Sequence, residues 1–426
     1  MPPILDVLPP AGSPDPADSV ESAEVAIIGA GAAGLFAGIF AGRTHPHRRI
    51  VLLDGAKKLG AKILVAGGGR CNVTHDEVSP EAYAGASRHA IKKVLRRFDV
   101  PQTIAFFAEM GVTLKREPTG KLFPTTDDAH TVLDALLRAV RESGAVIRHP
   151  ARVDWVRRDG TGFLIGGAWG ALRAEKLVLA TGGRALPKSG SDGGGYALAQ
   201  TLGHTLTPRI FPALVPLILP EGHFIRALSG ITVPATLEVR TGTGKRLISF
   251  THSTLCTHFG LSGPSVLDIS RYYLDARHHD PAAQLLINWL PNLTSEGFES
   301  VLQAAGRANI ARVLNEHVPE RLALALCHAA QLDPATPAHQ LTREGRKALV
   351  RAATALPLPI VGDRGFTYAE VTAGGVPLTE IHLETMESRV CPHLYLCGEI
   401  CDVDGRIGGY NFQWAWSSGY VAGVSL

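Results

Sequence analysis

The sequence predicts an α/β fold in which a domain of alternating strands and helices is interrupted by an antiparallel β domain and a small helical domain. Three observations support this prediction. A strand, a glycine-rich turn, a helix and a second strand follow one another between residues 23 and 54; short apolar runs broken by Pro and Gly begin near residue 205; and strand–turn–helix sequence returns near residue 366. A chain of 426 residues has room for two or three domains with a sizeable core.

The composition of each segment justifies its place in this scheme. Residues 1 to 22 are rich in Pro, Ser and Asp and lack the basic start and apolar stretch of a signal peptide, so we expect a disordered tail. Residues 23 to 204 and 366 to 426 are expected to form one α/β domain, because the last segment resembles its missing strand and helix. Short apolar runs predict a β domain over residues 205 to 296, and apolar residues at three-to-four spacing predict a helical domain over residues 297 to 365.

The overall composition favours a compact enzyme that acts on a small molecule. Hydrophobic residues make up 45% and charged residues 19%, which excludes disordered and fibrous proteins. The formal charge of +3 is too small to predict a nucleic-acid or membrane partner. Six scattered cysteines indicate a reducing compartment, and no apolar run approaches the ~20 residues of a membrane span, so we expect a cytoplasmic protein. No metal site is expected, because no second Cys or His pair completes a ligand set with Cys397 and Cys401.

Residues 29 to 34 read Gly-Ala-Gly-Ala-Ala-Gly, which fits the G-x-G-x-x-G pattern between a strand and a helix, and Asp54 follows twenty residues after the last glycine. Glycines let the backbone approach a pyrophosphate at a helix N-terminus, and an acid at this spacing accepts hydrogen bonds from a ribose. A glycine turn kept only for packing is the alternative, which the neighbouring strand, helix and acid weaken. Both FAD and NAD satisfy this pattern.

Two later glycine turns separate these cofactors. The run LVLATGG ends a strand at Ala180-Thr181-Gly182, and the run LYLCGE ends another at Gly398-Glu399. A ligand that touches three strand ends must be long, and an extended FAD fits. Each turn alone would be a weak signal, so the prediction depends on their order and on the strands that precede them.

Two further glycine-rich stretches are candidates for contact with the same ligand. Residues 57 to 72 combine Lys62, three consecutive glycines and Arg70, which predicts an anion cradle, with a solvated loop as the alternative. Cys71 is a candidate redox thiol, although a small packed cysteine is the more common case. Residues 408 to 411 begin an apolar helix whose N-terminus would stabilise negative charge on a reduced flavin, with an ordinary core helix as the alternative.

Together these passages resemble the bacterial BaiN-type, or aminoacetone-oxidase-type, FAD-dependent oxidoreductases, which belong to the two-dinucleotide-binding-domain flavoproteins. The resemblance covers residues 23 to 426 and rests on the ordered motifs AIIGAGAAGL, LGAKILVAGGGRCN, GKLFP, LVLATGG, THFGLSGP, VTAGGV, MESR and CGEICDVDGRIGGYNFQWAWSSG. It implies a Rossmann-like FAD-binding domain with an inserted barrel-like β domain and a small helical domain. The FAD contacts that it implies are Gly29, Ala30, Gly31, Ala33, Gly34, Asp54, Lys62, Gly69, Arg70, Cys71, Asn72, Val153, Ala180, Thr181, Gly182, Gly398, Glu399, Gly409, Tyr410 and Asn411.

Two positions depart from the family pattern. The family usually has Glu where this chain has Asp54, which is a conservative change. Its usual run Gly-Ser-Thr-Gly-Asp-Gly-Tyr reads GSDGGGY at residues 190 to 196, so the acid has moved from the position of Gly194 to Asp192. The second departure changes whatever contact this carboxylate makes.

Catalytic groups are less clearly marked than cofactor contacts. His258 in THFGLSGP lies where the inserted domain would meet the flavin region, with a structural histidine as the alternative. Tyr410 is a candidate proton donor beside the flavin, with a packing role as the alternative. Lys121 and Arg364 are candidates for holding an acidic substrate, and solvated surface charge is the alternative for both.

We therefore expect an FAD-dependent oxidoreductase that reduces a small unsaturated carbonyl compound with electrons from NAD(P)H. The nicotinamide would bind transiently, because the chain has no second dinucleotide-binding pattern. One alternative is an amine oxidase that uses O₂. Another is an RNA-binding flavoprotein similar to tRNA-modifying enzymes, against which the near-neutral charge argues.

Overall fold

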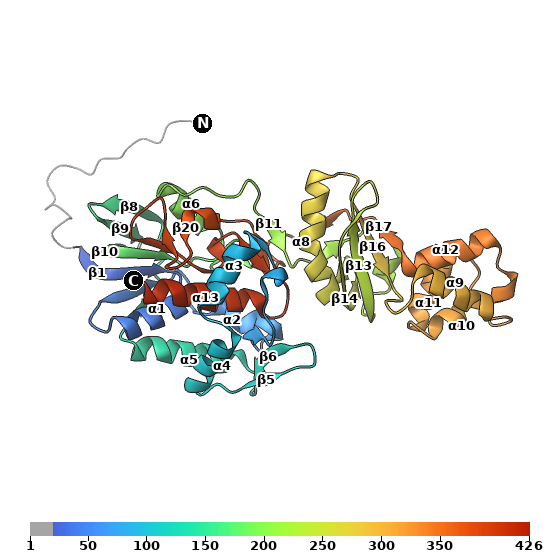
Figure 1. Cartoon of the computed structure of the whole chain (residues 1–426), viewed down its shortest axis with the longest axis horizontal. Helices are drawn as coiled ribbons and strands as arrows, with labels where there is room; N and C mark the ends of the chain where they lie inside the picture. Colours follow the sequence, from blue (N-terminus) through green and yellow to red (C-terminus); the bar gives the residue numbers. More distant parts are fainter. Residues whose placement is uncertain (1–19) are drawn as a thin grey trace.

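The computed structural model describes residues 20 to 426, and Figure 1 shows an elongated molecule with a large sheet at one end and the inserted elements at the other. The expected tail at residues 1 to 22 lies almost wholly outside the described residues. Its boundary needs a correction, because Glu21 and Ser22 already pair with β10 at the start of β1 (Glu21–Ile28). No helix among residues 20 to 426 is both long and apolar enough to cross a membrane.

The first sheet has a parallel centre in the order β7-β2-β1-β10-β22, and antiparallel strands extend it beyond β22 and beside β10. The strand β2 consists of the run IVLL and is buried throughout, as expected for a parallel strand covered on both faces. The other strands of the sheet are β7 (Val146–Arg148), β8 (Trp155–Asp159), β9 (Gly162–Gly167), β10 (Gly170–Leu179), β20 (Ile381–His382), β21 (Glu387–Ser388) and β22 (Leu394–Leu396), and β2 spans Ile50–Leu53.

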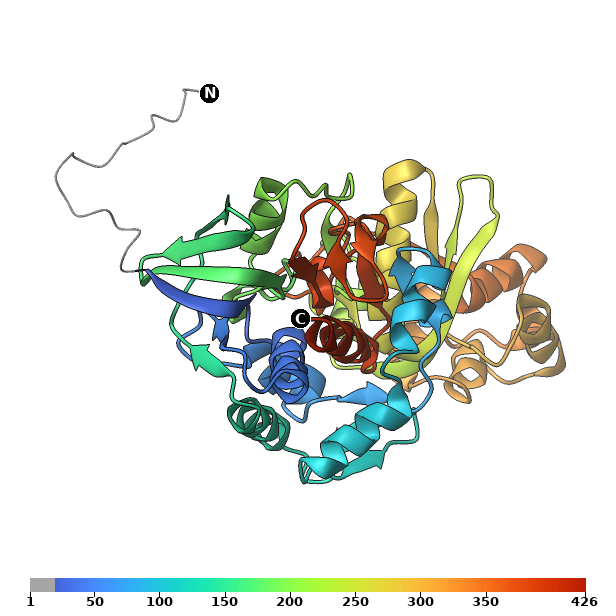
Figure 2. The same ribbon diagram turned by 60° about the vertical axis from the view of Figure 1, so that its left-hand side comes forward.

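The helices α1 (Ala32–Thr44) and α13 (Tyr410–Val424) lie side by side although they come from opposite ends of the chain, as Figure 2 shows. Glycine makes this close contact possible. A Cβ atom at Gly419 of α13 would lie 2.5 Å from the carbonyl oxygen of Ala33 in α1. The last segment of the chain therefore completes the domain that the first segment begins.

The remaining elements of this part are short and surround the sheet. The strands β3, β6 and β5 form one small sheet, and β4 pairs with β23 in another. The helix α5 is amphipathic, because Val132, Leu136 and Val140 recur at a spacing of four and are all buried. The bounds are α2 (Ala61–Val65), β3 (Thr74–His75), β4 (Tyr83–Gly85), α3 (Arg88–Leu95), α4 (Val100–Glu109), β5 (Leu114–Arg116), β6 (Lys121–Pro124), α5 (Ala129–Glu142), α6 (Gly194–Thr201) and β23 (Val403–Gly405).

The inserted sheet is antiparallel, in the order β17-β16-β13-β14-β15-β12-β18. In β13, Val233, Ala235, Leu237 and Val239 are buried and alternate with outward residues, which is the period of two of a strand with one face on a core. The outer strands β17 and β18 do not pair with each other within the described residues, but only three residues join them, so the sheet curls until its two edges come close, as expected for a barrel-like form. Its elements are β12 (Leu217–Ile218), α7 (Phe224–Ala227), β13 (Thr232–Arg240), β14 (Arg246–Thr257), β15 (Gly260–Ser262), α8 (Pro264–His279), β16 (Gln284–Asn288), β17 (Leu356–Leu358) and β18 (Gly362–Asp363).

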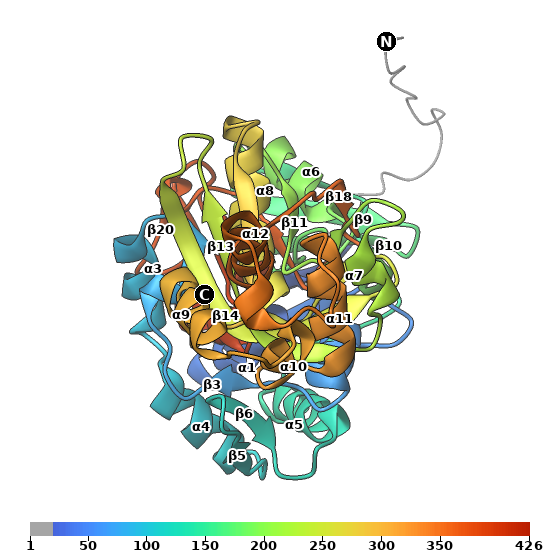
Figure 3. The same ribbon diagram turned by 90° about the vertical axis from the view of Figure 1, so that its right-hand side faces the viewer.

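Four helices follow β16 and lie beyond the inserted sheet, in front of it in the view of Figure 3. Their apolar residues share one hydrophobic core with that sheet; Phe298, Leu326 and Leu349, for example, belong to the same buried cluster as Leu237 of β13. The helical segment therefore packs as an extension of the inserted sheet. The bounds are α9 (Ser295–Ala304), α10 (Ile310–Asn315), α11 (Glu320–Ala329) and α12 (Arg343–Thr354).

The two parts of the molecule meet at a short junction. The strand β11 (Phe211–Ala213), on the way into the insertion, pairs with β19 (Val371–Ala373), on the way out. Two ion pairs also join the two parts: in one, α8 supplies the carboxylate, and in the other it supplies the guanidinium. Arg406 Nη2 lies 2.8 Å from Oδ2 of Asp268 in α8, and Arg271 Nε of α8 lies 3.0 Å from Asp404 Oδ2. They hold α8 against the segment that precedes α13.

Candidate functional site

A cavity of about 1160 Å³ opens at the carboxyl ends of the parallel strands. Residues that follow β1, β2, β10 and β22 line it, which is where open α/β sheets bind their ligands. Sixteen of the twenty residues at which the resemblance implies FAD contacts border this cavity. The four that lie outside its lining are Gly34, Gly69, Cys71 and Tyr410.

The first glycine turn owes its shape to close backbone contacts. Gly29 has a φ of +102°, and a Cβ atom there would lie 2.4 Å from the carbonyl oxygen of Ala180. A Cβ atom at Gly34 would lie 1.8 Å from the carbonyl oxygen of Gly29, so Gly34 serves the packing of the turn. Gly31, in contrast, has open space at its Cβ position and begins α1 without a side-chain cap. The N-terminus of α1 is thus exposed to the cavity, where its N–H groups favour an anion.

Asp54 follows β2 and bridges two turns at the cavity wall. Its Oδ2 accepts a hydrogen bond from the Ala30 N–H group at 2.7 Å, and its Oδ1 accepts one from the Ala56 N–H group at 2.8 Å. Each carboxylate oxygen has a second lone pair. The carboxylate can therefore accept a ribose hydroxyl while the backbone holds it in place.

The acid that departs from the family pattern has a partner in this chain. Arg152 Nη1 donates to Asp192 Oδ2 at 2.7 Å, and Asp192 Oδ1 accepts a hydrogen bond from the Gly194 N–H group at 2.9 Å. Burial opposes ionisation of Asp192, but the Arg152 guanidinium and the Gly194 N–H group outweigh it and lower the pKa of this carboxyl. The pair lies beside Val153 in the cavity lining.

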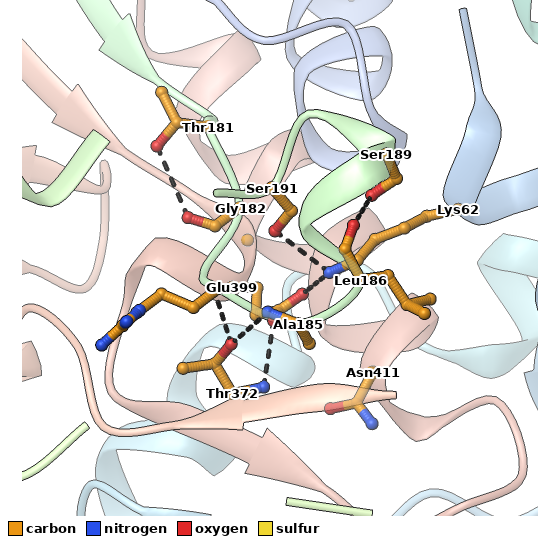
Figure 4. Close-up of polar contacts among 12 residues, drawn as sticks. Lys62, Thr181, Gly182, Ala185, Leu186, Ser189, Ser191, Thr372, Glu399 and Asn411 are labelled. Carbon is orange, nitrogen blue, oxygen red and sulfur yellow. Dashed lines mark hydrogen bonds and ion pairs between the residues drawn. The ribbon is translucent and has the colours of Figure 1, made fainter. Parts of the chain in front are cut away.

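A second network, shown in Figure 4, joins the lysine of the anion cradle to the acidic turn. Lys62 Nζ lies 2.6 Å from Glu399 Oε2 and donates to Ser191 Oγ at 3.2 Å. Glu399 Oε1 accepts a hydrogen bond from the Thr372 N–H group at 3.0 Å. The side chains of Lys62 and Glu399 are 26% and 18% exposed, so each charge compensates the other where water is scarce. The ammonium predicted to bind an anion is instead paired with a carboxylate.

Thr372 of β19 organises the second glycine turn, and the sequence analysis did not identify it. Its Oγ1 accepts hydrogen bonds from the N–H groups of Arg184 at 2.7 Å and Ala185 at 2.9 Å (Figure 4). A Cβ atom at Gly183 would lie 2.5 Å from this oxygen. Arg184 and Thr372 are 188 positions apart, so only the fold shows that they meet.

Two residues of the GGGRCN motif have roles that differ from those predicted. Arg70 lines the cavity, but its Nη1 lies 2.6 Å from Glu117 Oε1 and 3.7 Å from Asp127 Oδ1, so its charge is already compensated. Cys71 is fully buried outside the lining. Burial raises the pKa of its thiol to about 12, which keeps it protonated and is a correction to the candidate redox role.

Neither candidate catalytic residue borders the cavity, so the structure supports neither assignment. His258 is exposed in the turn between β14 and β15, because THFG closes a tight hairpin of the inserted sheet. Tyr410 is buried at the start of α13, where its ring stacks on His75 with a centroid distance of 4.9 Å. Its carbonyl oxygen accepts a hydrogen bond from the Tyr83 hydroxyl at 2.8 Å. Tyr410 is therefore a packing residue in this structure.

The end of the cavity near the inserted sheet, which we call the junction end, is lined by Lys121, Glu370 and Arg406. Lys121 of β6 extends past Gly408, whose Cβ atom would lie 3.4 Å from Lys121 Cε. Glu370 immediately precedes β19 and was missed because it belongs to no motif with a known spacing. Arg406 is held by the buried carboxylate of Asp268.

The cavity carries an excess of positive charge. Its lining contains eight cationic and four acidic side chains, an excess of four, whereas the whole chain has a formal charge of only +3. Glu117 and Asp268 lie outside the lining and already compensate Arg70 and Arg406, which reduces the excess from four to two. The two phosphates of a dinucleotide would compensate this remainder. The acidic members are Asp54, Asp192, Glu370 and Glu399.

The family comparison decides the relationship of the chain. Residues 23–425 match the family described as HI0933-like protein Rossmann domain. The chain belongs to this family. It is 34% identical over 403 residues to the 3-dehydro-bile acid delta(4,6)-reductase of Clostridium scindens, with 94% of this chain and 98% of that protein covered. It is 36% identical over 410 residues to the ribosomal RNA dihydrouridine synthase of Escherichia coli, with 96% and 98% covered.

Solved structures agree on the fold. A quinol fumarate reductase of E. coli superposes with a TM-score of 0.51 at 16% identity, covering 95% of this chain and 69% of that one. A 3-ketosteroid delta1-dehydrogenase of Sterolibacterium denitrificans superposes with a TM-score of 0.51 at 13% identity, covering 95% and 99%. At these identities the likeness concerns the fold alone. Membership of the HI0933-like family identifies the chain as an FAD-dependent flavoprotein oxidoreductase.

The residues at the cavity fit FAD. The Oδ1 atom of Asn72 is buried and has no hydrogen-bond partner within the described part of the chain, although Asn72 lines the cavity. Such an atom requires a partner, which a polar edge of a ligand would supply. The helices α1 and α13 both begin at the cavity with glycine and no side-chain cap. The turn at residues 29 to 31 would hold the pyrophosphate, Asp54 the ribose, and Asn72 and the start of α13 the flavin ring.

Proposed function

We propose that this flavoprotein reduces a carbon–carbon double bond conjugated to a carbonyl group, with electrons from NAD(P)H. The observation that carries the proposal is the junction end of the cavity, which extends the dinucleotide site to an acid, Glu370, and two cations, Lys121 and Arg406. The volume of about 1160 Å³ exceeds the ~300 to 1,000 Å³ of pockets for drug-sized ligands, as a site for an extended dinucleotide requires. A substrate beside the cofactor would meet both a proton source and positive charge for a developing enolate.

The names of the relatives support the same chemistry. A 3-dehydro-bile acid delta(4,6)-reductase saturates double bonds in conjugation with a ketone, and a dihydrouridine synthase saturates the uracil ring at the double bond conjugated to its carbonyl group. Both reactions add a hydride to the β carbon and a proton to the α carbon. Bound FAD would supply the hydride after its own reduction.

The electron donor is expected to bind only during turnover. The described residues contain one parallel sheet of the dinucleotide-binding kind, and the inserted sheet is antiparallel throughout. A nicotinamide nucleotide would therefore use the same cavity, whose excess of cationic side chains suits its phosphates.

Two classes of compound are candidates for the substrate that the reduced flavin would reduce. A small cyclic enone fits the near-neutral charge of the chain. Ribosomal RNA is the second candidate, because two relatives at 36% and 34% identity are named as ribosomal RNA dihydrouridine synthases and the cavity has four more cationic than acidic side chains.

An anaerobic spectroscopic titration tests the proposal. NADH and NADPH are added in turn to the purified holoprotein, and bleaching of the flavin absorption by one of them identifies the donor. The reduced protein is then mixed with 2-cyclohexen-1-one or with a uridine-rich RNA fragment, and we expect one of the two to restore the oxidised spectrum. Recovery only on admission of O₂, together with bleaching by an amine and not by either nucleotide, would favour the amine oxidase alternative.

A further inference from the structure

Glu370 is the one acidic residue that lines the junction end of the cavity among the described residues. Within residues 20 to 426 it has no ion pair and no side-chain hydrogen bond, whereas each of the other three acids that line the cavity is bound to a backbone N–H group or a cation. Its backbone is anchored, because the Glu370 N–H group donates to the carbonyl oxygen of Leu214 at 3.2 Å. The side chain is thus positioned by the junction of β11 and β19 and is free to meet a ligand.

The surroundings of Glu370 raise the pKa of its carboxyl group. Glu370 is an exposed residue that borders the cavity. Desolvation of its carboxyl group raises this pKa, and the negative charge of Asp268 on α8 adds to the rise, while the ammonium of Lys121 on β6 opposes it. Asp268 is paired with Arg406, which in turn contacts His252 of β14, so Lys121 is the cation of this group that has no ion pair among residues 20 to 426.

We propose that Glu370 is the catalytic proton donor of the reductase and that Lys121 stabilises the carboxylate that remains. This assignment rests on the proposed function. Glu370 would take the role of proton donor for which His258 and Tyr410 were candidates, and neither of those two residues lines the cavity.

Reduced FAD, when bound, would supply a hydride to the β carbon and return to its oxidised form, and the π electrons of the double bond would move toward the carbonyl oxygen. The O–H bond of Glu370 then breaks, a C–H bond forms at the α carbon, and the proton leaves Glu370 as a carboxylate beside Lys121. A proton from water restores the acid before the next turnover.

The test separates this step from reduction of the flavin. The wild type and Glu370→Gln, each as holoprotein, are reduced with light and EDTA so that the identity of the donor does not matter, and reoxidation by 2-cyclohexen-1-one is followed without oxygen. We expect Glu370→Gln to reoxidise at least about 100-fold more slowly, the usual minimum for a lost general acid. A uridine-rich RNA fragment replaces the enone if RNA is the acceptor that reoxidises the wild type.

Two further measurements distinguish a proton donor from a residue that only shapes the site. The wild-type rate should fall as the pH rises through the pKa of Glu370, and Glu370→Gln should show no such limb. Lys121→Met should move the limb to higher pH, because Lys121 lowers this pKa. In D₂O the wild-type product should carry one deuterium at the α carbon on a single face.

An infrared measurement gives a readout that needs no turnover. At neutral pH the holoprotein should show a carboxylic acid C=O band that shifts in D₂O, is lost in Glu370→Gln and persists in the control Glu221→Gln. Glu221 is exposed and lies outside the cavity lining. Retention of the flavin spectrum in each variant confirms that the fold is intact.

The outcomes separate the two proposals. If the wild type is reoxidised and Glu370→Gln keeps its rate and pH profile, the role of Glu370 is overturned while the proposed function stands. If neither conjugated acceptor reoxidises the wild type, the proposed function fails and the role of Glu370 fails with it, whatever the infrared band shows. Absence of the band in an active wild type would also overturn the assignment.

Discussion

The two ends of the cavity are built in different ways. The end near Asp54 is made of backbone: glycine turns, uncapped helix starts, and a carboxylate held by two N–H groups. The junction end is made of side chains from β6 and from the segments before β19 and α13, and its Arg406 is held from outside the lining by Asp268 of α8 and His252 of β14. The first end can be recognised from short motifs, and the second exists only once distant segments have met.

This difference has a physical basis. A backbone cradle is specified by residues next to one another, because φ angles and close contacts are local. A side-chain cluster needs no particular spacing in the chain, and its members carry ordinary charges that elsewhere would be solvated. Substitutions should therefore act on the first end through shape and on the second end through charge, and the following predictions test that contrast.

The largest effect is expected at the backbone cradle. Gly29→Ala should abolish retention of FAD, because its Cβ atom would lie 2.4 Å from the carbonyl oxygen of Ala180 in a backbone of φ +102°. The flavin absorbance that remains with the protein after gel filtration measures this loss. Gly170→Ala is the matched control, since Gly170 also has a positive φ, +114°, but its Cβ atom would meet nothing within 4 Å. FAD retained by Gly29→Ala would show that close approach does not shape this turn.

The next effect is expected at the charges of the junction end. Arg406→Met should lower the free energy of unfolding by about 2 to 4 kcal/mol at neutral pH, because it leaves the buried carboxylate of Asp268 without its cation. Urea unfolding measures the change. The double variant Arg406→Met with Asp268→Asn should recover part of the loss, and a loss equal to the single variant would contradict the charge argument.

A smaller effect, of opposite sign, is expected at Asp402 between the two ends. Burial, together with the charge of Asp404, raises the pKa of Asp402 to about 6. Because the folded-state pKa is raised, this carboxyl favours the folded state at low pH and the contribution is lost as the pH rises toward 6. Asp402→Asn should therefore increase stability by about 1 to 2 kcal/mol above pH 7 and change it little at pH 4, which melting curves at the two pH values would measure.

The smallest effect is expected at the half-exposed pair beside the cradle. The side chains of Arg152 and Asp192 are 56% and 35% exposed, and such pairs contribute about 1 kcal/mol or less. Asp192→Asn should therefore cost no more than about 1 kcal/mol, and 1 M salt should reduce the difference from the wild type. Urea unfolding at low and high salt checks this; a large, salt-independent loss would mean that the backbone hydrogen bond to Gly194 dominates.

The elements that could be predicted from sequence have local causes. The turn at residues 29 to 34 and the acid at Asp54 follow from a strand, glycines and a helix in order, and the structure places them around one cavity. The strand order of the inserted sheet could not be predicted, because pairing between β13 and β16, for example, joins strands that are far apart in the chain. His258 and Tyr410 were misplaced because a motif indicates the segment but not the direction of a side chain.

By itself the sequence determined the glycine turns, the strand that precedes each of them, and the family, because these depend on near neighbours and on the order of motifs. The tertiary structure alone decided which charges are compensated. It paired Lys62 with Glu399 across 337 positions and, within the described part of the chain, left the Glu370 carboxyl group near Lys121 with no hydrogen bond or ion pair. Electrostatic interactions depend on distance in space and on burial, and neither of these can be read from distance along the chain.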